Sequence, residues 1–342
     1  MAILDIFNND AFSLTSMLDT VDQMDYQPSA LGDMGIFTPN PVRTETVAIE
    51  SRDGVLGLIQ TSERGSPLEQ RGNEKRKIRD FRSSRIAKGD RIMASELAFL
   101  RGHGEQEQVV MAQQEVARRL SGPAGIMSDI ELTMENMRLG AIQGIVTDKD
   151  DSVIYDWFSE FGVAAATEIG FDFANQTEGD FRKTCTQVVR NMKRASKGAW
   201  SNGTRVHAMC GDDFWDALVA LPEVRATYLN RNEAYYVENG GAFEKVNYGG
   251  ITWENYQGTD DNSTVAIAAT ECKFFPVNAP GAFLEVFSPG EQFEHIGQLG
   301  QRAYPMIVRD NDRDMYVDVE AYSYPLLVCT RPSMLQSGRA GA

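Results

Sequence analysis

The chain has 342 residues, of which 42% are hydrophobic and 24% are charged. This composition is typical of a globular protein and excludes disordered, collagen-like and disulfide-scaffold chains. At about 100 to 200 residues per domain, the length predicts two or three lobes. The formal charge of −16 comes from 33 basic and 49 acidic residues. It argues against a surface whose main role is to grip nucleic-acid phosphates, because that affinity comes from Lys and Arg that displace counterions.

The sequence shows no feature of a secreted, membrane or metal-binding protein. The N-terminal residues lack the basic region of a signal peptide, and no stretch approaches the ~18 apolar residues of a membrane span. Four widely spaced cysteines and three histidines form no recognisable zinc or redox motif. We therefore expect a protein made in the cytosol, with no membrane partner, no metal and no cofactor.

Residues 1–42 form an acidic segment without Lys or Arg, in which aspartates give a charge of −6. Apolar residues recur at helical spacing from Leu14 to Met24, with Asp10 as the expected helix cap. Such a helix is too short to be stable alone, so its apolar side is expected to dock on another surface. Pro and Gly residues between 28 and 41 predict an extended course after the helix.

Two features follow the acidic segment. The alternating residues around 42–52 and 55–61, separated by Asp53 and Gly54, predict a hairpin with a tight turn. Residues 64–91 carry ten basic side chains against four acidic ones, a local charge of +6. Such a run is most often a solvated face, and contact with nucleic acid is the second interpretation. A third is contact with an acidic surface of a like subunit, which the acidic segment supplies.

The rest of the chain predicts further helices and strands. Residues 93–120 are expected to form one helix, and Ser128 with Glu131 has the pattern of a capping box that starts a second, extending to Gln143. Asp212 and Asp213 are expected to cap a later helix. The remaining expected elements are a hairpin at 145–147 and 152–158, a helix at 179–197, and strands at 205–210, 243–247, 250–256, 264–268, 282–287, 303–309, 315–322 and 325–330.

His207 is the one candidate for acid or base catalysis, because Asp212 and Asp213 follow it closely and Ser196 and Ser201 precede it. The signal is weak, since His207 lies in an expected strand and the two aspartates are expected helix caps. A structural role is therefore favoured by about ten to one, and no catalytic residue is assigned.

Asp310, Asp312 and Asp314 have the spacing of the first three ligands of a calcium-binding loop. The pattern fails at Met315, where glycine is needed, and at Ala321, where glutamate is needed. We therefore expect the tip of a hairpin here. The cysteines lie in apolar surroundings and are expected to be core residues rather than nucleophiles.

Several segments resemble a known family. Asp10–Leu18, Tyr26–Phe37 and Val42–Glu50 resemble the opening of the lambda-type phage major capsid proteins, the capsid E family. Ala303–Asp312 and Tyr322–Pro332 are similar to the two closing strands of that family. The length and the order of the elements fit as well, so the resemblance covers nearly the whole chain.

The resemblance implies the Hong Kong ninety-seven capsid fold, an α+β fold. Its parts would be an N-arm at 1–41, an extended hairpin loop at 42–93, a peripheral domain with a long spine helix at 94–165 and 301–342, and an axial α/β domain at 166–300. It also implies a structural protein of the virion rather than an enzyme, assembled in the host bacterial cytoplasm as hexamers and pentamers around double-stranded DNA. The implied partners are further copies of the chain, a scaffolding protein and a portal, with a decoration protein left open and the packaged DNA in loose, non-specific contact.

The opposite charge blocks indicate where neighbouring subunits would touch. The expected intersubunit contact residues are Asp19, Asp22, Asp25, Arg76, Lys77, Arg79 and Arg82. Two alternative functions stay open at this point: an encapsulin-like shell that packages protein, and a soluble hydrolase that uses His207.

Overall fold

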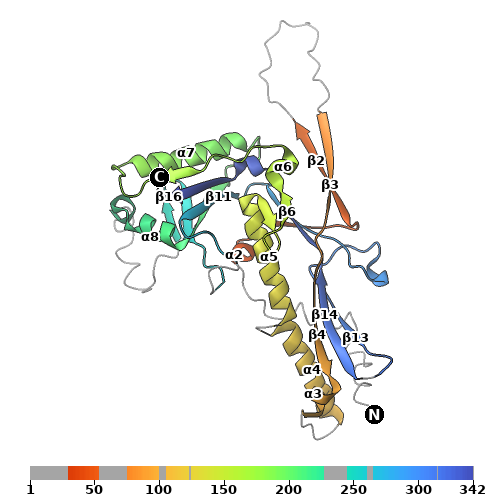
Figure 1. The fold of residues 1–342 in the computed structure, drawn as a ribbon. Coiled ribbons are helices and arrows are strands. Elements are labelled where there is room, and N and C mark those ends of the chain that lie inside the picture. The colour runs from red at the N-terminus through yellow and green to blue at the C-terminus, as the bar shows by residue number, and fades with distance from the viewer. Residues whose placement is uncertain are drawn as a thin grey trace, which may run out of the picture.

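The computed structural model describes residues 30–53, 75–99, 105–122, 125–226, 245–259, 265–313 and 315–341. These residues form an elongated α+β fold in which a head, a stem and a projecting hairpin meet at a central region (Figure 1). The strands of the head, the stem and the projecting hairpin belong to separate sheets. The parts are therefore joined by packing between elements rather than by one continuous sheet.

The head is a six-stranded sheet with two helices packed on it. In the order of the sheet its strands are β7 (Ile169–Phe171), β16 (Gln336–Ala340), β11 (Glu271–Val277), β8 (Arg205–Cys210), β10 (Ile251–Asn255) and β9 (Lys245–Tyr248). The sheet is mixed, because β8 runs parallel to β10 and antiparallel to β11. Helices α7 (Asp180–Ala195) and α8 (Asp212–Ala220) contribute Phe181 and Phe214 to an aromatic core around Trp253. This shared core explains why α7 has its apolar side chains along one side.

The stem combines three helices with a three-stranded antiparallel sheet. Its elements are α3 (Ala94–Phe99), α4 (Glu105–Ser121), α5 (Ile126–Gln143), β4 (Ile86–Met93), β14 (Tyr316–Ser323) and β13 (Tyr304–Arg309). Val116 and Leu120 of α4 and Ile130 of α5 belong to one apolar core with Val317 and Val319 of β14. Helix α5 runs along the stem into the central region (Figure 1). Its first half lies in the stem core and its second half in the central core.

The central region surrounds the C-terminal half of α5. It contains α2 (Ala30–Asp33), α6 (Trp157–Phe161), the sheet of β1 (Thr38–Pro41), β12 (Phe283–Phe287) and β15 (Pro325–Cys329), the hairpin of β5 (Ile145–Thr147) and β6 (Val153–Asp156), and the short turns η3 (Phe293–His295) and η4 (Pro332–Met334). Gly144 ends α5 with a φ of +90°, and a Cβ at this position would lie 2.3 Å from the Phe158 ring. The turn from α5 into β5 therefore requires glycine.

The projecting hairpin consists of β2 (Thr46–Asp53) and β3 (Lys75–Arg82), and it extends away from the other described parts (Figure 1). The pairing differs from the expected one: β2 pairs with β3, and residues 55–61, the expected partner, lie outside the described residues. Phe81 anchors the base, because it is 3% exposed and its ring lies 5.3 Å from that of Trp157. Further along β3, Ile78 is 67% exposed.

Most of the other expected elements are confirmed with shifted bounds. The hairpin at 145–158, the helix at 179–197 and the strands at 205–210, 243–247, 250–256, 282–287, 303–309, 315–322 and 325–330 correspond to β5 with β6, α7, β8, β9, β10, β12, β13, β14 and β15. The helix expected over 93–120 is seen as α3 and α4, and 100–104 lie outside the described residues. Residues 265–268 form no strand, and β1, β4, β7, β11 and β16 were not among the expected strands.

Two expected helix caps are wrong, and close packing explains both. Helix α5 begins after Gly125 and α8 begins after Gly211, and neither cap has a side-chain hydrogen bond. A Cβ would lie 2.8 Å from a backbone carbonyl oxygen at Gly125 and 2.2 Å from one at Gly211. This crowding selects glycine at the cap position, so Ser128, Asp212 and Asp213 lie inside the first turns.

Candidate intersubunit surface

The structure describes the side chains of two of the seven expected contact residues. The side chains of the other five lie outside the described residues: Asp19, Asp22, Asp25, Arg76 and Lys77. The guanidinium of Arg79 lies 5.4 Å from the centre of the Phe161 ring, a cation–π contact. Nε of Arg82 lies 3.3 Å from Oε1 of Glu45, and these side chains are 71% and 70% exposed. Such an exposed pair contributes ~0.2 to 1 kcal/mol, so Arg82 can exchange Glu45 for another carboxylate at little cost.

Tyr155 fixes the backbone of β3 at the base of the projecting hairpin. Its hydroxyl donates to the Arg82 carbonyl at 2.7 Å and accepts from the Arg82 N–H at 3.1 Å. The Tyr155 ring also stacks on Trp157, with ring centres 5.1 Å apart. The end of β3 is therefore attached firmly to the central region, so that the hairpin leaves it in a defined direction.

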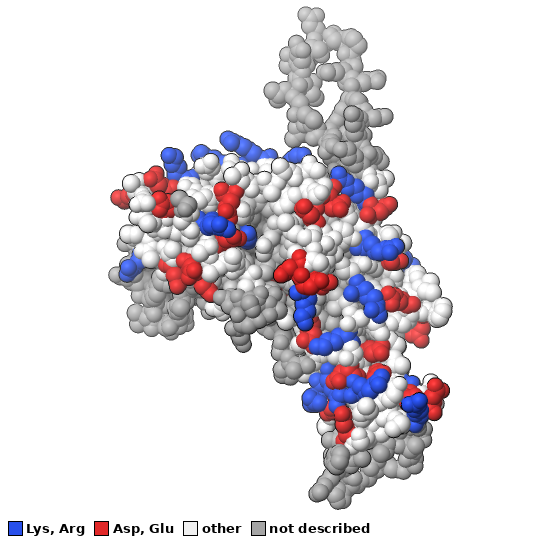
Figure 2. Space-filling model, viewed as in Figure 1, with Lys and Arg blue, Asp and Glu red and all other residues white. Residues whose placement is uncertain are grey.

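Charges of the two signs are distributed differently over the stem and the head. Along the stem and the hairpin base, basic and acidic side chains alternate on the face seen in Figure 2. Two exposed ion pairs of β4 and the segment before it are Lys88 with Asp129, and Arg85 with Glu291 at 3.3 Å. Along the edge of the head formed by α7, basic side chains gather instead (Figure 2). The exposed bases of α7 and its C-terminal end are Arg182, Lys183, Arg190, Lys193, Arg194 and Lys197.

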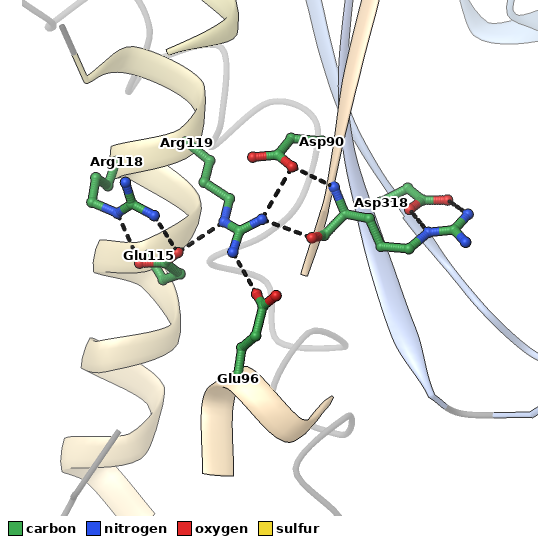
Figure 3. A network of polar contacts seen from close by, with 7 residues as sticks. Asp90, Glu96, Glu115, Arg118, Arg119 and Asp318 are labelled. Carbon is green, nitrogen blue, oxygen red and sulfur yellow. Dashed lines mark hydrogen bonds and ion pairs between the residues drawn. The ribbon is translucent and has the colours of Figure 1, made fainter. Parts of the chain in front are cut away.

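Arg119 is the centre of an ion-pair network at the far end of the stem (Figure 3). Its Nε lies 2.8 Å from Oε1 of Glu115, its Nη1 lies 3.1 Å from Oδ1 of Asp90, and its Nη2 contacts Glu96. Arg118 binds the same Glu115 carboxylate through two hydrogen bonds of 3.0 and 2.7 Å. Hydrogen bonds from Arg118 and then Arg119 lower the pKa of Glu115 to about 2. The network joins α4 to α3 and β4.

The network continues into β14 through Arg91. The Arg119 guanidinium donates to the Arg91 carbonyl at 2.7 Å. The Arg91 guanidinium binds Asp318 with two hydrogen bonds of 2.7 and 2.9 Å, and it lies 3.7 Å from the centre of the Tyr316 ring. A planar guanidinium suits both contacts, because it forms paired bonds to a carboxylate and stacks on an aromatic ring.

Arg138 on α5 is the centre of a second, buried network. Its side chain is 2% exposed, with Nη1 2.7 Å from Oε1 of Glu131 and Nη2 2.8 Å from Oε1 of Glu285. Glu135 approaches Nη1 to 3.4 Å, and Arg302 lies 2.7 Å from the same Glu131 oxygen. Burial raises the pKa of Glu131. Burial alone would lower the pKa of Arg138. The ion pairs with Glu285 and Glu131 outweigh this effect, so the pKa of Arg138 is raised above its usual value.

The candidate catalytic group is not assembled in the structure. His207 on β8 is 6% exposed, and its Nε2 lies 3.0 Å from Oε2 of Glu254 on the neighbouring strand β10. Asp212 instead accepts a hydrogen bond from Nδ2 of Asn255 at 3.0 Å. The two candidate serines are engaged in hydrogen bonds within local turns. His207 is therefore a buried member of the head sheet, as the structural interpretation predicts.

The remaining sequence motifs also have structural roles. Asp310 accepts hydrogen bonds from the backbone N–H groups of Asp312 and Arg313 at 3.2 Å, so the tip between β13 and β14 is the expected turn. All four cysteines are buried, and burial raises the pKa of the Cys185 and Cys329 thiols to about 12. In the described part of the chain, His, Cys, Asp and Glu form no metal-binding group. None of the described helices is both long and apolar enough to cross a bilayer.

Comparisons with known proteins agree with one another. The family model of phage major capsid protein E matches residues 13–340. The chain is similar to the major capsid protein of Salmonella phage Felix O1, with 23% identity and 97% of each chain covered. Among solved structures it resembles the mature capsid of bacteriophage PhiM1 and the capsid of cyanophage Pam1, each with a TM-score of 0.50. The identities are 11% and 12%, over 93% and 90% of this chain and 89% and 88% of those chains. The α+β capsid fold of the Hong Kong ninety-seven type is thereby confirmed.

Proposed function

The chain belongs to the phage major capsid protein E family, and we propose that it builds the icosahedral shell of a tailed bacteriophage around packaged double-stranded DNA. In this proposal the chain assembles with its own copies into hexamers and pentamers. The observation that carries the function is the family match, which spans residues 13–340. The Salmonella phage relative, which has the name of a major capsid protein, aligns over 97% of both chains.

The elongated architecture supports a role as a shell subunit. A closed shell requires each subunit to contact several copies through different surfaces. The head, the stem and the projecting hairpin offer such separate surfaces (Figure 1). The hairpin also leaves the apolar side chain of Ile78 67% exposed.

We assign the parts of the shell subunit to the ranges that the family resemblance implies. These are the N-arm at 1–41, the extended loop at 42–93, the peripheral domain at 94–165 and 301–342, and the axial domain at 166–300. The division after residue 165 has support in the chain path, because it falls between α6 of the central region and β7 of the head. Several strand pairs cross the assigned divisions. β4 pairs with β14 of the stem, β16 pairs with β11 and β7 of the head, and β12 pairs with β1 and β15 in the central region. These strands would tie the assigned domains together.

Further partners follow from the role of a shell subunit. We propose a scaffolding protein and a portal as assembly partners in the host bacterial cytoplasm, and a decoration protein as a further candidate on the finished virion. The packaged DNA is proposed to make loose, non-specific contact, because a net charge of −16 disfavours binding to phosphates. No enzymatic activity is proposed.

An ionic contact between neighbouring copies is part of the proposal. It would join the arm aspartates to the loop bases: Asp19, Asp22, Asp25, Arg76, Lys77, Arg79 and Arg82. Support comes from the opposite charges of the two blocks, −6 over 1–42 and +6 over 64–91. Because Arg79 packs on Phe161, the test changes only Arg76→Glu and Lys77→Glu. Assembly is expected to fail while the unfolding midpoint of the subunit is unchanged, and normal shells from this variant would exclude the contact.

Neither alternative function is favoured. A hydrolase that uses His207 would pair it with Asp212 or Asp213, whereas the observed contact is with Glu254. A nanocompartment that packages protein is less well supported, because the matching family is one of phage capsid proteins and the Salmonella phage relative is a major capsid protein.

The experiment that tests shell formation uses the purified protein, expressed with and without the neighbouring phage genes. Negative-stain electron microscopy and sedimentation velocity are expected to reveal rings, tubes or closed shells. A small, stable oligomer that never assembles under either condition would contradict the proposed function.

A further inference from the structure

An apolar patch lies on the segment that follows β12. Of the exposed large apolar side chains in the described residues, three fall within a single short segment, here called the 293–299 loop. They are Phe293, Ile296 and Leu299, with exposed fractions of 93%, 70% and 50%. Single exposed apolar residues are common on protein surfaces, but a local concentration of them marks an interaction site.

The 293–299 loop is held in place by buried and hydrogen-bonded groups beneath it. His295 is 5% exposed, and its ring centre lies 4.5 Å from that of Tyr304. The Tyr304 hydroxyl accepts a hydrogen bond from the Gln301 N–H at 2.7 Å. Gly297 turns the backbone with a φ of +76°, and its carbonyl accepts from Nη1 of Arg43 at 3.2 Å. The apolar side chains are therefore presented on a preorganised backbone, which lowers the entropic cost of binding.

The position of the loop leaves it open to a neighbour. It lies on the side of the central region that faces away from the head (Figure 1). At its end the Gly300 N–H donates to the Val42 carbonyl at 2.8 Å, so the loop is pinned beside the segment that leads into the projecting hairpin. The loop is thus attached to its own chain through Gly297 and Gly300, while Phe293 and Ile296 are exposed.

A second copy of the chain is the partner that the proposed shell favours. Each copy has a net charge of −16, so copies repel one another at a distance and need short-range contacts to offset this repulsion. Burial of apolar side chains supplies such an attraction and is insensitive to net charge. In a shell of many copies, another copy of this chain is also the surface that lies nearest.

We propose that the 293–299 loop is an intersubunit contact, in which Phe293 and Ile296 of one copy pack against a second copy of the chain. This inference rests on the proposed function, since an assembled shell is what brings a second copy to the loop. A stable interface buries about 800 Å² on each partner. The loop is therefore one apolar element of a larger contact, beside the polar surfaces of the stem and the hairpin.

Photo-cross-linking tests the contact directly. Phe293 is replaced by the photoreactive analogue benzoylphenylalanine, the protein is assembled and illuminated, and the products are separated on a denaturing gel. Covalent dimers are expected, with the cross-linked peptide mapping to a second copy, and the same protein kept dilute and unassembled is expected to remain monomeric. A cross-link within one chain, for example to residues 1–29, or to a scaffolding protein instead, would overturn the proposal.

A substitution experiment separates this inference from the proposed function. The double variant Phe293→Ser with Ile296→Ser should fold normally, because both positions are exposed. It should raise the concentration needed for assembly roughly tenfold or more, since it removes two large apolar groups from the contact. The control Val153→Ser changes a residue that is 60% exposed on β6. If the unmodified chain never assembles, the proposed function fails; if it assembles and the double variant does so equally well, the loop contact alone fails.

Discussion

Arg138 on α5 and Glu285 on β12 are 147 residues apart in the chain and form a buried ion pair, with Nη2 2.8 Å from Oε1. The pair connects the helix that runs along the stem to the central sheet. Glu131 and Glu135 approach the same guanidinium from α5. Charges removed from water need partners, so Arg138, with Arg302 on Glu131, compensates several carboxylates where the stem meets the central region.

Replacing this cation is expected to destabilise the subunit strongly. Arg138→Met should lower the free energy of unfolding by ~3 to 5 kcal/mol, because it removes the buried cation that pairs with Glu285 and Glu131. Chemical denaturation of the unassembled subunit measures the change. The control is Arg118→Met on α4, whose side chain is 66% exposed, so its loss should destabilise the subunit much less than the loss of Arg138. Equal effects of the two variants would show that burial of the Arg138 network contributes nothing.

The stem network is expected to make stability depend on pH in the acid range. Hydrogen bonds from Arg118 and Arg119 lower the pKa of Glu115 from 4.5 to about 2. A carboxyl group with a lowered folded-state pKa stabilises the protein above its unfolded-state pKa, and that stabilisation is lost as the pH falls. The contribution of Glu115 should therefore be complete above pH 4.5 and disappear towards pH 2.

Glu115→Gln is the variant that isolates this contribution. It should be less stable than the unmodified subunit at neutral pH, and the two stabilities should converge as the pH falls through the range between the two pKa values. Denaturant unfolding at a series of pH values measures the difference. A difference that stays constant with pH would mean that the carboxylate is not held ionised by its two arginines.

The sequence predicts the elements whose cause is local. The apolar spacing of α7 and the turn residues between β13 and β14 are both visible in the chain, and both elements form where expected. The polar strand β16, with the sequence Gln-Ser-Gly-Arg-Ala, has no such signal. It becomes a strand because β11 and β7 supply partners on both sides. Pairing between distant segments is the information that a local pattern lacks.

The candidate surface shows the same limit. The basic run that includes Arg79 and Arg82 is obvious in the sequence, but their contacts with Phe161 and Glu45 depend on the fold. A sequence signal for the buried network does exist. Glu131, Glu135 and Arg138 directly follow the core positions Ile130, Met134 and Met137 on α5. Charged residues next to core positions on three successive turns indicate a row of charges that becomes buried when the helix packs. Glu285, the partner of Arg138, cannot be identified from the helix alone.

Gly144 at the end of α5 is expected to tolerate no side chain. Gly144→Ala should destabilise the subunit by roughly 2 kcal/mol or more, because it combines a left-handed backbone with a clash against Phe158. The matched control is Gly162→Ala at the end of α6, where φ is +63° and a Cβ would meet nothing within 4 Å. The control should therefore cost only the backbone strain, about 1 kcal/mol. Thermal unfolding compares the two, and equal losses would mean that Phe158 moves aside freely.

Phe81 is expected to control how firmly the projecting hairpin is attached. Its ring lies 5.3 Å from Trp157, 5.8 Å from Tyr155 and 6.2 Å from Phe161. Phe81→Ala should remove ~3 to 5 kcal/mol of stability, because it deletes a large buried side chain and leaves a cavity. Hydrogen exchange should become faster in β2 and β3 before it changes in the head, since the two regions have separate cores.

The control for Phe81 lies three residues earlier on the same strand. Ile78 is 67% exposed, so Ile78→Ala should change the stability of the isolated subunit by less than about 0.5 kcal/mol. If exchange in β2 and β3 is unchanged in Phe81→Ala, the aromatic cluster is not what anchors the hairpin. If Phe81→Ala instead loosens the hairpin and also prevents assembly, neighbouring copies require a hairpin with a fixed direction. The attachment of β3 through Tyr155 agrees with such a requirement.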